Sequence, residues 1–103
     1  MLRIILTDSA ARDLDEIWDY IAVEKYSPMS ADMLIDEFDQ RFKLLVTQPL
    51  MGEAVERLRP NTRRTVVKKR FIIFYEPVED GILILRVLRG AKLIQPTDLG
   101  SPD

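Results

Sequence analysis

The sequence predicts a two-layer α+β domain with the element order β-α-α-β-β-β. Three observations predict it: two neighbouring segments with apolar residues at helical spacing, three later segments of strand character, and a tight-turn signal between the last two strands. A helical hairpin must bury two apolar stripes, and a sheet must cover one face. Packing the hairpin on a small antiparallel sheet satisfies both needs. A chain of 103 residues has room for one such domain.

The chain begins with a predicted strand and a first helix. Residues 2–6 are short, apolar and β-branched, which is typical of a strand. A helix can begin after any of three capping residues, namely Thr7, Asp8 and Ser9. Its apolar stripe is Leu14, Ile17, Trp18 and Ile21. The acids mostly off that stripe are expected on a solvated face without metal-site geometry: Asp13, Asp15, Glu16 and Asp19.

A second helix is expected after a short link. The first helix should end near Pro28, because proline disfavours helix at the preceding residue. Ser30 is the expected cap of the second helix, and Pro49 and Gly52 should close it. Its apolar positions are Ala31, Leu34, Ile35, Phe38, Phe42, Leu45 and Val46. The short link predicts an antiparallel hairpin.

The second half predicts strands. Residues 49–62 form an irregular connector, and Glu79-Asp80-Gly81 is a hairpin turn signal. The expected strands are 64–68, 71–76 and 82–88. The last of them is continuously apolar, which favours a covered, central position. We assign residues 1–92 to a single domain and expect residues 93–103 to be a loose C-terminal tail.

Charge is divided unevenly along the chain. Residues 1–56 hold five basic and twelve acidic residues, whereas residues 57–103 hold ten basic and five acidic ones. One basic run contains no acid: Arg57, Arg59, Arg63, Arg64, Lys68, Lys69 and Arg70. This run indicates a surface for phosphates or for an acidic protein segment. Residues 68–70 also suit a simple polar turn between strands.

Composition excludes several chemistries. The chain has no cysteine and no histidine, which removes disulfides, thiolate metal sites and the commonest general acid/base. We expect no metal and no cofactor. The longest apolar runs are about five residues, far short of the roughly 20 that span a bilayer. We therefore expect a cytoplasmic protein without membrane contact.

The last strand carries two arginines with different expected roles. Arg86 can pair internally with an acid, whereas Arg89 lies at the strand end beside Gly90 and can reach solvent. Tyr75 lies in an apolar strand and is expected to pack there. The other aromatic residues assigned to packing are Trp18, Phe38, Phe42 and Phe74.

Three stretches together resemble the ParE toxins of the ParE/RelE superfamily of type II toxin–antitoxin systems. They are Ala11–Ala22, Pro49–Gly52 with the basic connector after it, and Phe71–Tyr75 continuing through Gly81 to Lys92. Their order and spacing carry the resemblance over about residues 3–92. It departs at Arg89, where ParE-like chains commonly have histidine.

The resemblance implies a fold similar to the one predicted above and a set of partners. ParE-like toxins are described as poisoning DNA gyrase, and RelE-like relatives cut messenger RNA in the ribosome. Both are neutralised by an antitoxin whose extended C-terminal segment wraps the toxin. A ParD-like antitoxin would form a hetero-oligomer with this chain. DNA contact would then be only indirect, through the antitoxin's DNA-binding domain, which represses the shared operon.

Our main hypothesis is therefore a gyrase inhibitor without catalytic residues. The surface residues expected to bind the target or the antitoxin are Arg57, Arg59, Arg63, Arg64, Lys69, Arg70, Arg89 and Lys92. The apolar residues expected to line an antitoxin groove are Trp18, Ile21, Phe38 and Phe42. The alternative is a ribosome-dependent mRNA endonuclease, which would use Arg64, Lys68 and Arg89. A third hypothesis is a non-toxic module that acts only as an antitoxin co-repressor.

Overall fold

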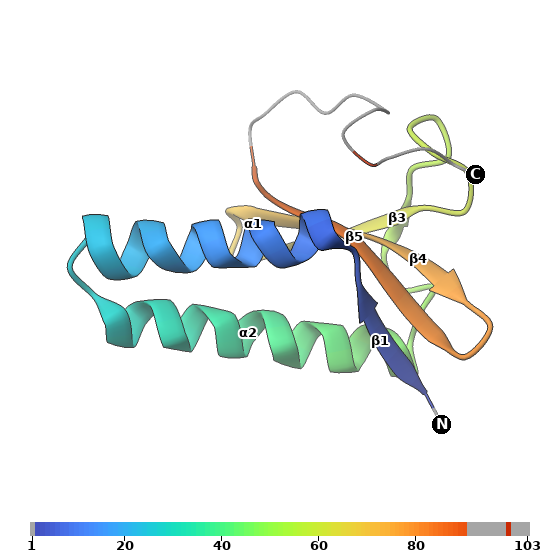
Figure 1. Cartoon of the computed structure of the whole chain (residues 1–103). Coiled ribbons are helices and arrows are strands. Elements are labelled where there is room, and N and C mark those ends of the chain that lie inside the picture. Colours follow the sequence, from blue (N-terminus) through green and yellow to red (C-terminus); the bar gives the residue numbers. More distant parts are fainter. Residues whose placement is uncertain (1, 91–98, 100–103) are drawn as a thin grey trace.

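The computed structural model describes residues 2–90 and Leu99, and it confirms the α+β class (Figure 1). A helical hairpin packs on one face of a five-stranded sheet. The elements in chain order are β1 (Arg3–Leu6), α1 (Asp8–Asp19), the π-helical turn η1 (Tyr20–Glu24), α2 (Pro28–Thr47), β2 (Glu53–Ala54), β3 (Arg63–Val67), β4 (Phe71–Val78) and β5 (Gly81–Arg89).

The sheet is mixed, which corrects the expectation of a purely antiparallel one. Its strand order is β1-β5-β4-β3-β2, and β1 runs parallel to β5 while every other pair is antiparallel. The first and last strands are therefore neighbours, with Ile4 opposite Ile82. After β1 the chain leaves the sheet through the hairpin and returns at the opposite edge as β2.

β5 is covered on both faces, as its continuous apolar sequence predicts. Its residues Ile82, Ile84 and Val87 pack in the cluster beneath the helices, with Phe38 and Phe42 of α2. The opposite face packs in a second cluster: Val55, Phe74, Leu85, Leu88 and Leu99. A register shift at Phe74/Tyr75 accompanies a change in which β5 residues face the helices. The strand is therefore rigidly held from two sides.

Several element boundaries differ from the predictions. α2 begins at Pro28, with Ser27 at the cap position, so Ser30 lies inside the helix rather than capping it. Proline suits the first turn because its missing N–H would have no partner there. The predicted irregular connector contains the short strand β2, which pairs with β3. Such a short strand forms because a distant segment pairs with it, and its two residues carry no local strand signal.

The start of α1 and the turn between β3 and β4 follow the local signals, whereas α1 ends at Asp19 and passes into the π-helical turn η1 instead of continuing to near Pro28. Of the three candidate caps, Thr7 caps α1: its Oγ1 accepts from the Ala10 N–H at 3.0 Å and donates to the Leu85 carbonyl at 2.8 Å. Lys68 and Lys69 adopt left-handed φ values of 57° and 60° in the turn between β3 and β4. Residues 68–70 thus form the polar turn that the sequence allowed.

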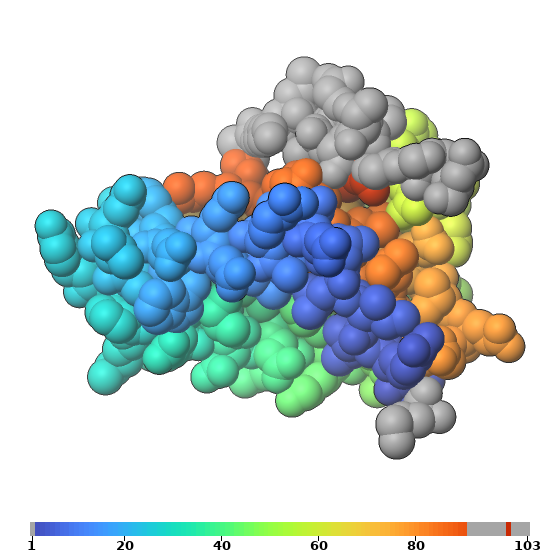
Figure 2. All heavy atoms as spheres, in the orientation of Figure 1, coloured from blue at the N-terminus to red at the C-terminus, as the bar shows by residue number. Residues whose placement is uncertain are grey.

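The hairpin projects beyond the sheet at the end where α1 passes into α2 (Figures 1 and 2). Across residues 2–90, no helix is long and apolar enough to cross a membrane. The predicted tail at residues 93–103 lies outside the described residues except for Leu99. That residue is 4% exposed and belongs to the second apolar cluster.

Candidate functional site

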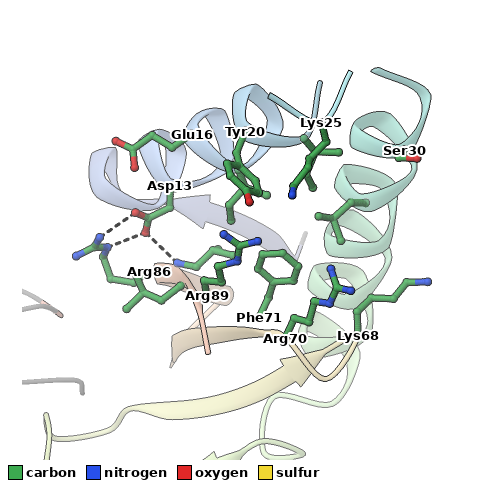
Figure 3. Close-up of a pocket in the computed structure, with 15 residues that line it drawn as sticks. Asp13, Glu16, Tyr20, Lys25, Ser30, Lys68, Arg70, Phe71, Arg86 and Arg89 are labelled. Atoms are coloured by element: carbon green, nitrogen blue, oxygen red, sulfur yellow. Dashed lines mark hydrogen bonds and ion pairs between the residues drawn. The ribbon is translucent and has the colours of Figure 1, made fainter. Parts of the chain in front are cut away.

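A groove lies between the helical hairpin and the paired ends of β4 and β5 (Figure 3). We call it the basic groove; its volume is about 900 Å³. Its apolar lining comes from α1, η1, α2 and the two strands: Ile17, Ile21, Leu34, Phe71, Val87 and Leu88. Its basic lining residues are Lys25, Lys68, Arg70, Arg86 and Arg89, and its acids are Asp13 and Glu16. The combination of apolar and cationic side chains suits an amphipathic, acidic ligand.

One end of the groove, the clamped end, is closed by Asp13 and Arg86. The Arg86 guanidinium donates from Nε to Asp13 Oδ2 at 2.7 Å and from Nη2 to Oδ1 at 2.8 Å. Asp13 Oδ2 also accepts from the Val87 N–H at 3.0 Å. β1 pairs with β5 only as far as Ile84, so Asp13 supplies a partner for the strand edge beyond it.

Asp13 corrects the expectation of a solvated acidic helix face. It is 7% exposed, whereas Asp15, Glu16 and Asp19 are exposed as predicted. The position is off the apolar stripe of α1, so helical periodicity did not distinguish it from its neighbours. The expectation that Arg86 pairs with an acid is confirmed. The sequence signal that could have predicted the pairing of Arg86 with Asp13 was the lone arginine within an apolar strand, because such an arginine needs a buried counter-charge.

The other end, the cationic end, consists of Tyr20, Lys25 and Arg89. The Arg89 guanidinium carbon lies 4.4 Å from the centre of the Tyr20 ring, and the Lys25 ammonium lies 5.5 Å from it. Hydrogen bonding with Arg89, and then with Lys25, lowers the pKa of the Tyr20 hydroxyl. Arg89 is exposed, as expected from its place at the strand end.

Tyr20 and Lys25 were missed at the sequence level. Tyr20 is off the apolar stripe of α1, and Lys25 follows η1. The wider π-helical turn between them changes the helical spacing, and such turns recur at functional sites. A tyrosine outside the stripe, beside an unexpected turn, gives no recognisable sequence signal.

The structure separates the predicted basic run into three partly buried arginines and four exposed residues. Arg59 lies 3.4 Å from Glu76, and Arg64 Nε donates to Glu53 Oε1 at 2.9 Å. Arg63 donates to the Leu50 and Gly52 carbonyls at 3.1 Å and 2.7 Å. The exposed members are Arg57, Lys68, Lys69 and Arg70. Only Lys68 and Arg70 of this run line the basic groove, and Lys92 lies outside the described residues.

The four residues predicted to line an antitoxin groove lie in different parts of the structure. Ile21 lines the basic groove. Phe38 and Phe42 are 0% and 4% exposed, so their packing role is confirmed and they provide no groove surface. Trp18 instead lines a shallow outer groove on the other side of the hairpin, where its Nε1 donates to Asp32 Oδ1 at 2.9 Å. The acids of that outer groove are Asp15, Asp32 and Asp36.

The residues considered for ribonuclease chemistry are only partly gathered. Lys68 and Arg89 line the basic groove, and Lys68 Nζ lies 3.7 Å from Glu37 Oε1, whereas Arg64 lies outside the groove and is paired with Glu53. Tyr75 is fully buried; its hydroxyl donates to the Pro49 carbonyl at 2.8 Å and accepts from the Gly52 N–H at 2.9 Å. Burial raises its pKa, which agrees with a packing role. Among residues 2–90 and Leu99, no cluster of acidic side chains could hold a metal ion.

Comparisons with known proteins agree with this architecture. The family described as "ParE toxin of type II toxin-antitoxin system, parDE" matches residues 4–94. A solved chain described as "Chromosomal ParDE TA system from P. aeruginosa" is 27% identical, with a TM-score of 0.69 over 86% of this chain and 96% of that chain. A conserved hypothetical protein from Helicobacter pylori is 16% identical over 91% of this chain and 100% of that chain, with a TM-score of 0.44. No curated protein matches significantly.

Proposed function

We propose that this chain, which belongs to the ParE toxin family of type II toxin–antitoxin systems, inhibits DNA gyrase and is neutralised by a ParD-like antitoxin. The type II toxin assignment follows from the family match and from the likeness to a ParDE system. The gyrase target and the ParD-like nature of the antitoxin are our proposals. In this proposal the toxin acts in the cytoplasm.

The basic groove is the observation that supports neutralisation by an acidic antitoxin segment. Its cationic residues Lys25, Arg70 and Arg89 surround an apolar lining, so a segment with alternating acidic and apolar residues would complement it. Such a segment would bury the apolar lining and neutralise the surrounding charge together. DNA contact would remain indirect, through the antitoxin.

Inhibition by binding, rather than by catalysis, is supported by the chemistry that the chain offers. The chain has no histidine. Arg64 is paired with Glu53 and lies outside the groove that Lys68 and Arg89 line. An endoribonuclease would need a proton acceptor and charge stabilisation on one substrate. The basic residues of the groove can stabilise charge, but charge stabilisation alone does not supply the proton acceptor that the reaction needs.

A supercoiling assay tests the gyrase proposal. Purified toxin is incubated with gyrase and relaxed plasmid, with and without the antitoxin encoded beside it. We expect loss of supercoiling or accumulation of cleaved plasmid, and restoration by the antitoxin. Unchanged gyrase activity would reject this target. Codon-phased cuts in translated messages would instead favour the endonuclease, and normal growth on induction without either effect would favour the co-repressor.

A further inference from the structure

We propose that the cationic end of the basic groove is a receptor for one carboxylate side chain of a protein partner. Arg89 and Lys25 would donate to the carboxylate, and the Tyr20 hydroxyl would add a third donor. This inference rests on the proposed neutralisation by an acidic antitoxin segment and names the contact that would anchor it.

The three donors come from η1, the residue that follows it, and the end of β5. Tyr20 belongs to η1 and Arg89 ends β5, and the Arg89 guanidinium carbon lies 4.4 Å from the Tyr20 ring centre. Lys25 approaches the same ring to within 5.5 Å (Figure 3). Two cations on one aromatic ring repel each other, and an added carboxylate between them relieves that repulsion.

The clamped end of the groove fixes this geometry. Asp13 connects α1 to β5 through Arg86 and the Val87 N–H. Tyr20 begins the element directly after α1, and Arg89 follows Val87 by two residues, so this connection lies close to both. The carboxylate of Asp13 forms an ion pair with the guanidinium of Arg86. Arg86 is thus neutralised by the chain itself, whereas the cationic end brings a guanidinium and an ammonium to the ring of Tyr20.

The surroundings favour a carboxylate of a protein over a nucleic-acid backbone. The apolar residues Ile17, Ile21 and Phe71 line the same groove and offer a surface that apolar peptide side chains can bury against and that ribose and phosphate groups cannot use. Glu16 also lines it, so a continuous polyanion would meet a like charge. A peptide with one acidic residue beside apolar residues would satisfy both the charge and the apolar lining.

Binding of defined peptides tests the receptor without knowledge of the antitoxin. Purified toxin is titrated with a labelled helical peptide of leucine and glutamate, a matched leucine–glutamine peptide, and a polyuridine oligonucleotide. We expect the glutamate peptide to bind best. Its affinity should fall about 10- to 100-fold in Arg89→Glu and in Lys25→Glu, because each change replaces an attraction by a repulsion.

Matched variants separate this site from general charge. Arg12→Glu makes the same charge change at an exposed residue outside the groove and should leave the affinity within about threefold of wild type. Arg89→Lys should recover most of the loss seen in Arg89→Glu. Circular dichroism of each variant checks that the fold is retained.

Three results would overturn the receptor: no measurable binding of the glutamate peptide, equal loss in Arg89→Glu and Arg12→Glu, or tighter binding of the oligonucleotide. The proposed function is tested separately by growth rescue with the antitoxin. Rescue of the wild-type and Arg89→Glu toxins alike would contradict the receptor and leave neutralisation standing. Failure to rescue the wild-type toxin would instead reject neutralisation.

Discussion

The two ends of the basic groove use the same kinds of residue for different purposes. At the clamped end, Arg86 of β5 meets Asp13 of α1, and the pair is largely buried, with side-chain exposures of 22% and 8%. At the cationic end, Arg89 of the same strand meets the aromatic ring of Tyr20 and stays exposed. An arginine is structural where its own chain supplies the counter-charge. It is available to a partner where the chain supplies a tyrosine in place of a counter-charge.

The largest expected effect tests the clamped end. Asp13→Ala should lower the free energy of unfolding by about 3 kcal/mol, because it leaves a half-buried guanidinium and the Val87 N–H without their carboxylate. Urea denaturation measures this change. Asp15→Ala, at an exposed position two residues along α1, is the matched control and should change the free energy by about 0.5 kcal/mol or less. Equal effects of the two changes would mean that the clamp is not structural.

A second prediction compares a buried tyrosine with the tyrosine of the cationic end. Tyr75→Phe removes a hydroxyl that bonds the Pro49 carbonyl and the Gly52 N–H, so it should cost about 2 kcal/mol of unfolding free energy. Tyr20→Phe should cost much less, since its hydroxyl lies in an open groove. Thermal unfolding of the two variants makes the comparison. A larger loss in Tyr20→Phe would reverse this assignment of structural roles.

The same two tyrosines should separate on alkaline titration. Hydrogen bonding with Arg89 and Lys25 lowers the pKa of Tyr20, and burial raises the pKa of Tyr75. Tyr20 therefore adds stability that is present above the unfolded-state pKa and is lost as the pH falls through its folded-state pKa. Tyr75 adds stability that is present below the unfolded-state pKa and is lost as the pH rises through its folded-state pKa.

Near-ultraviolet absorbance can follow both phenols. The ionisation of Tyr20 is identified by its absence from Tyr20→Phe. The pKa of Tyr20 should rise in Arg89→Met, because hydrogen bonding with Arg89 is the main cause of its lowering. The Arg57→Met variant is the control and should leave the titration unchanged. If Tyr20 ionises after Tyr75, the cationic end does not have the arrangement described.

The smallest expected effect concerns the stability of the cationic end itself. Arg89→Met should change the free energy of unfolding by about 0.5 kcal/mol, because an exposed cation–aromatic contact contributes little. The same measurement on Arg86→Met should give a clear loss, since Asp13 would remain buried without its cation. Similar small losses in both variants would remove the distinction between the two arginines.

Local chemistry made much of the fold predictable. The apolar periodicity of α1 and α2, the cap at Thr7, the turn signal ending at Gly81 and the continuous apolar run of β5 each depend on neighbouring residues. The parallel pairing of β1 with β5 and the short strand β2 were not predictable in this way. They depend on which distant segments become neighbours, and no local pattern records that.

For the candidate site, the sequence by itself determined the available chemistry: a histidine-free chain with a basic second half and an arginine at the end of the last strand. Only the tertiary structure decided which charges stay available. It turned Asp13 inward onto Arg86, gave Arg59, Arg63 and Arg64 partners in the chain, and brought Tyr20 and Lys25 to Arg89. The physical reason is that a charge becomes structural or available according to the partner that folding places beside it. Residues far apart in sequence supply that partner.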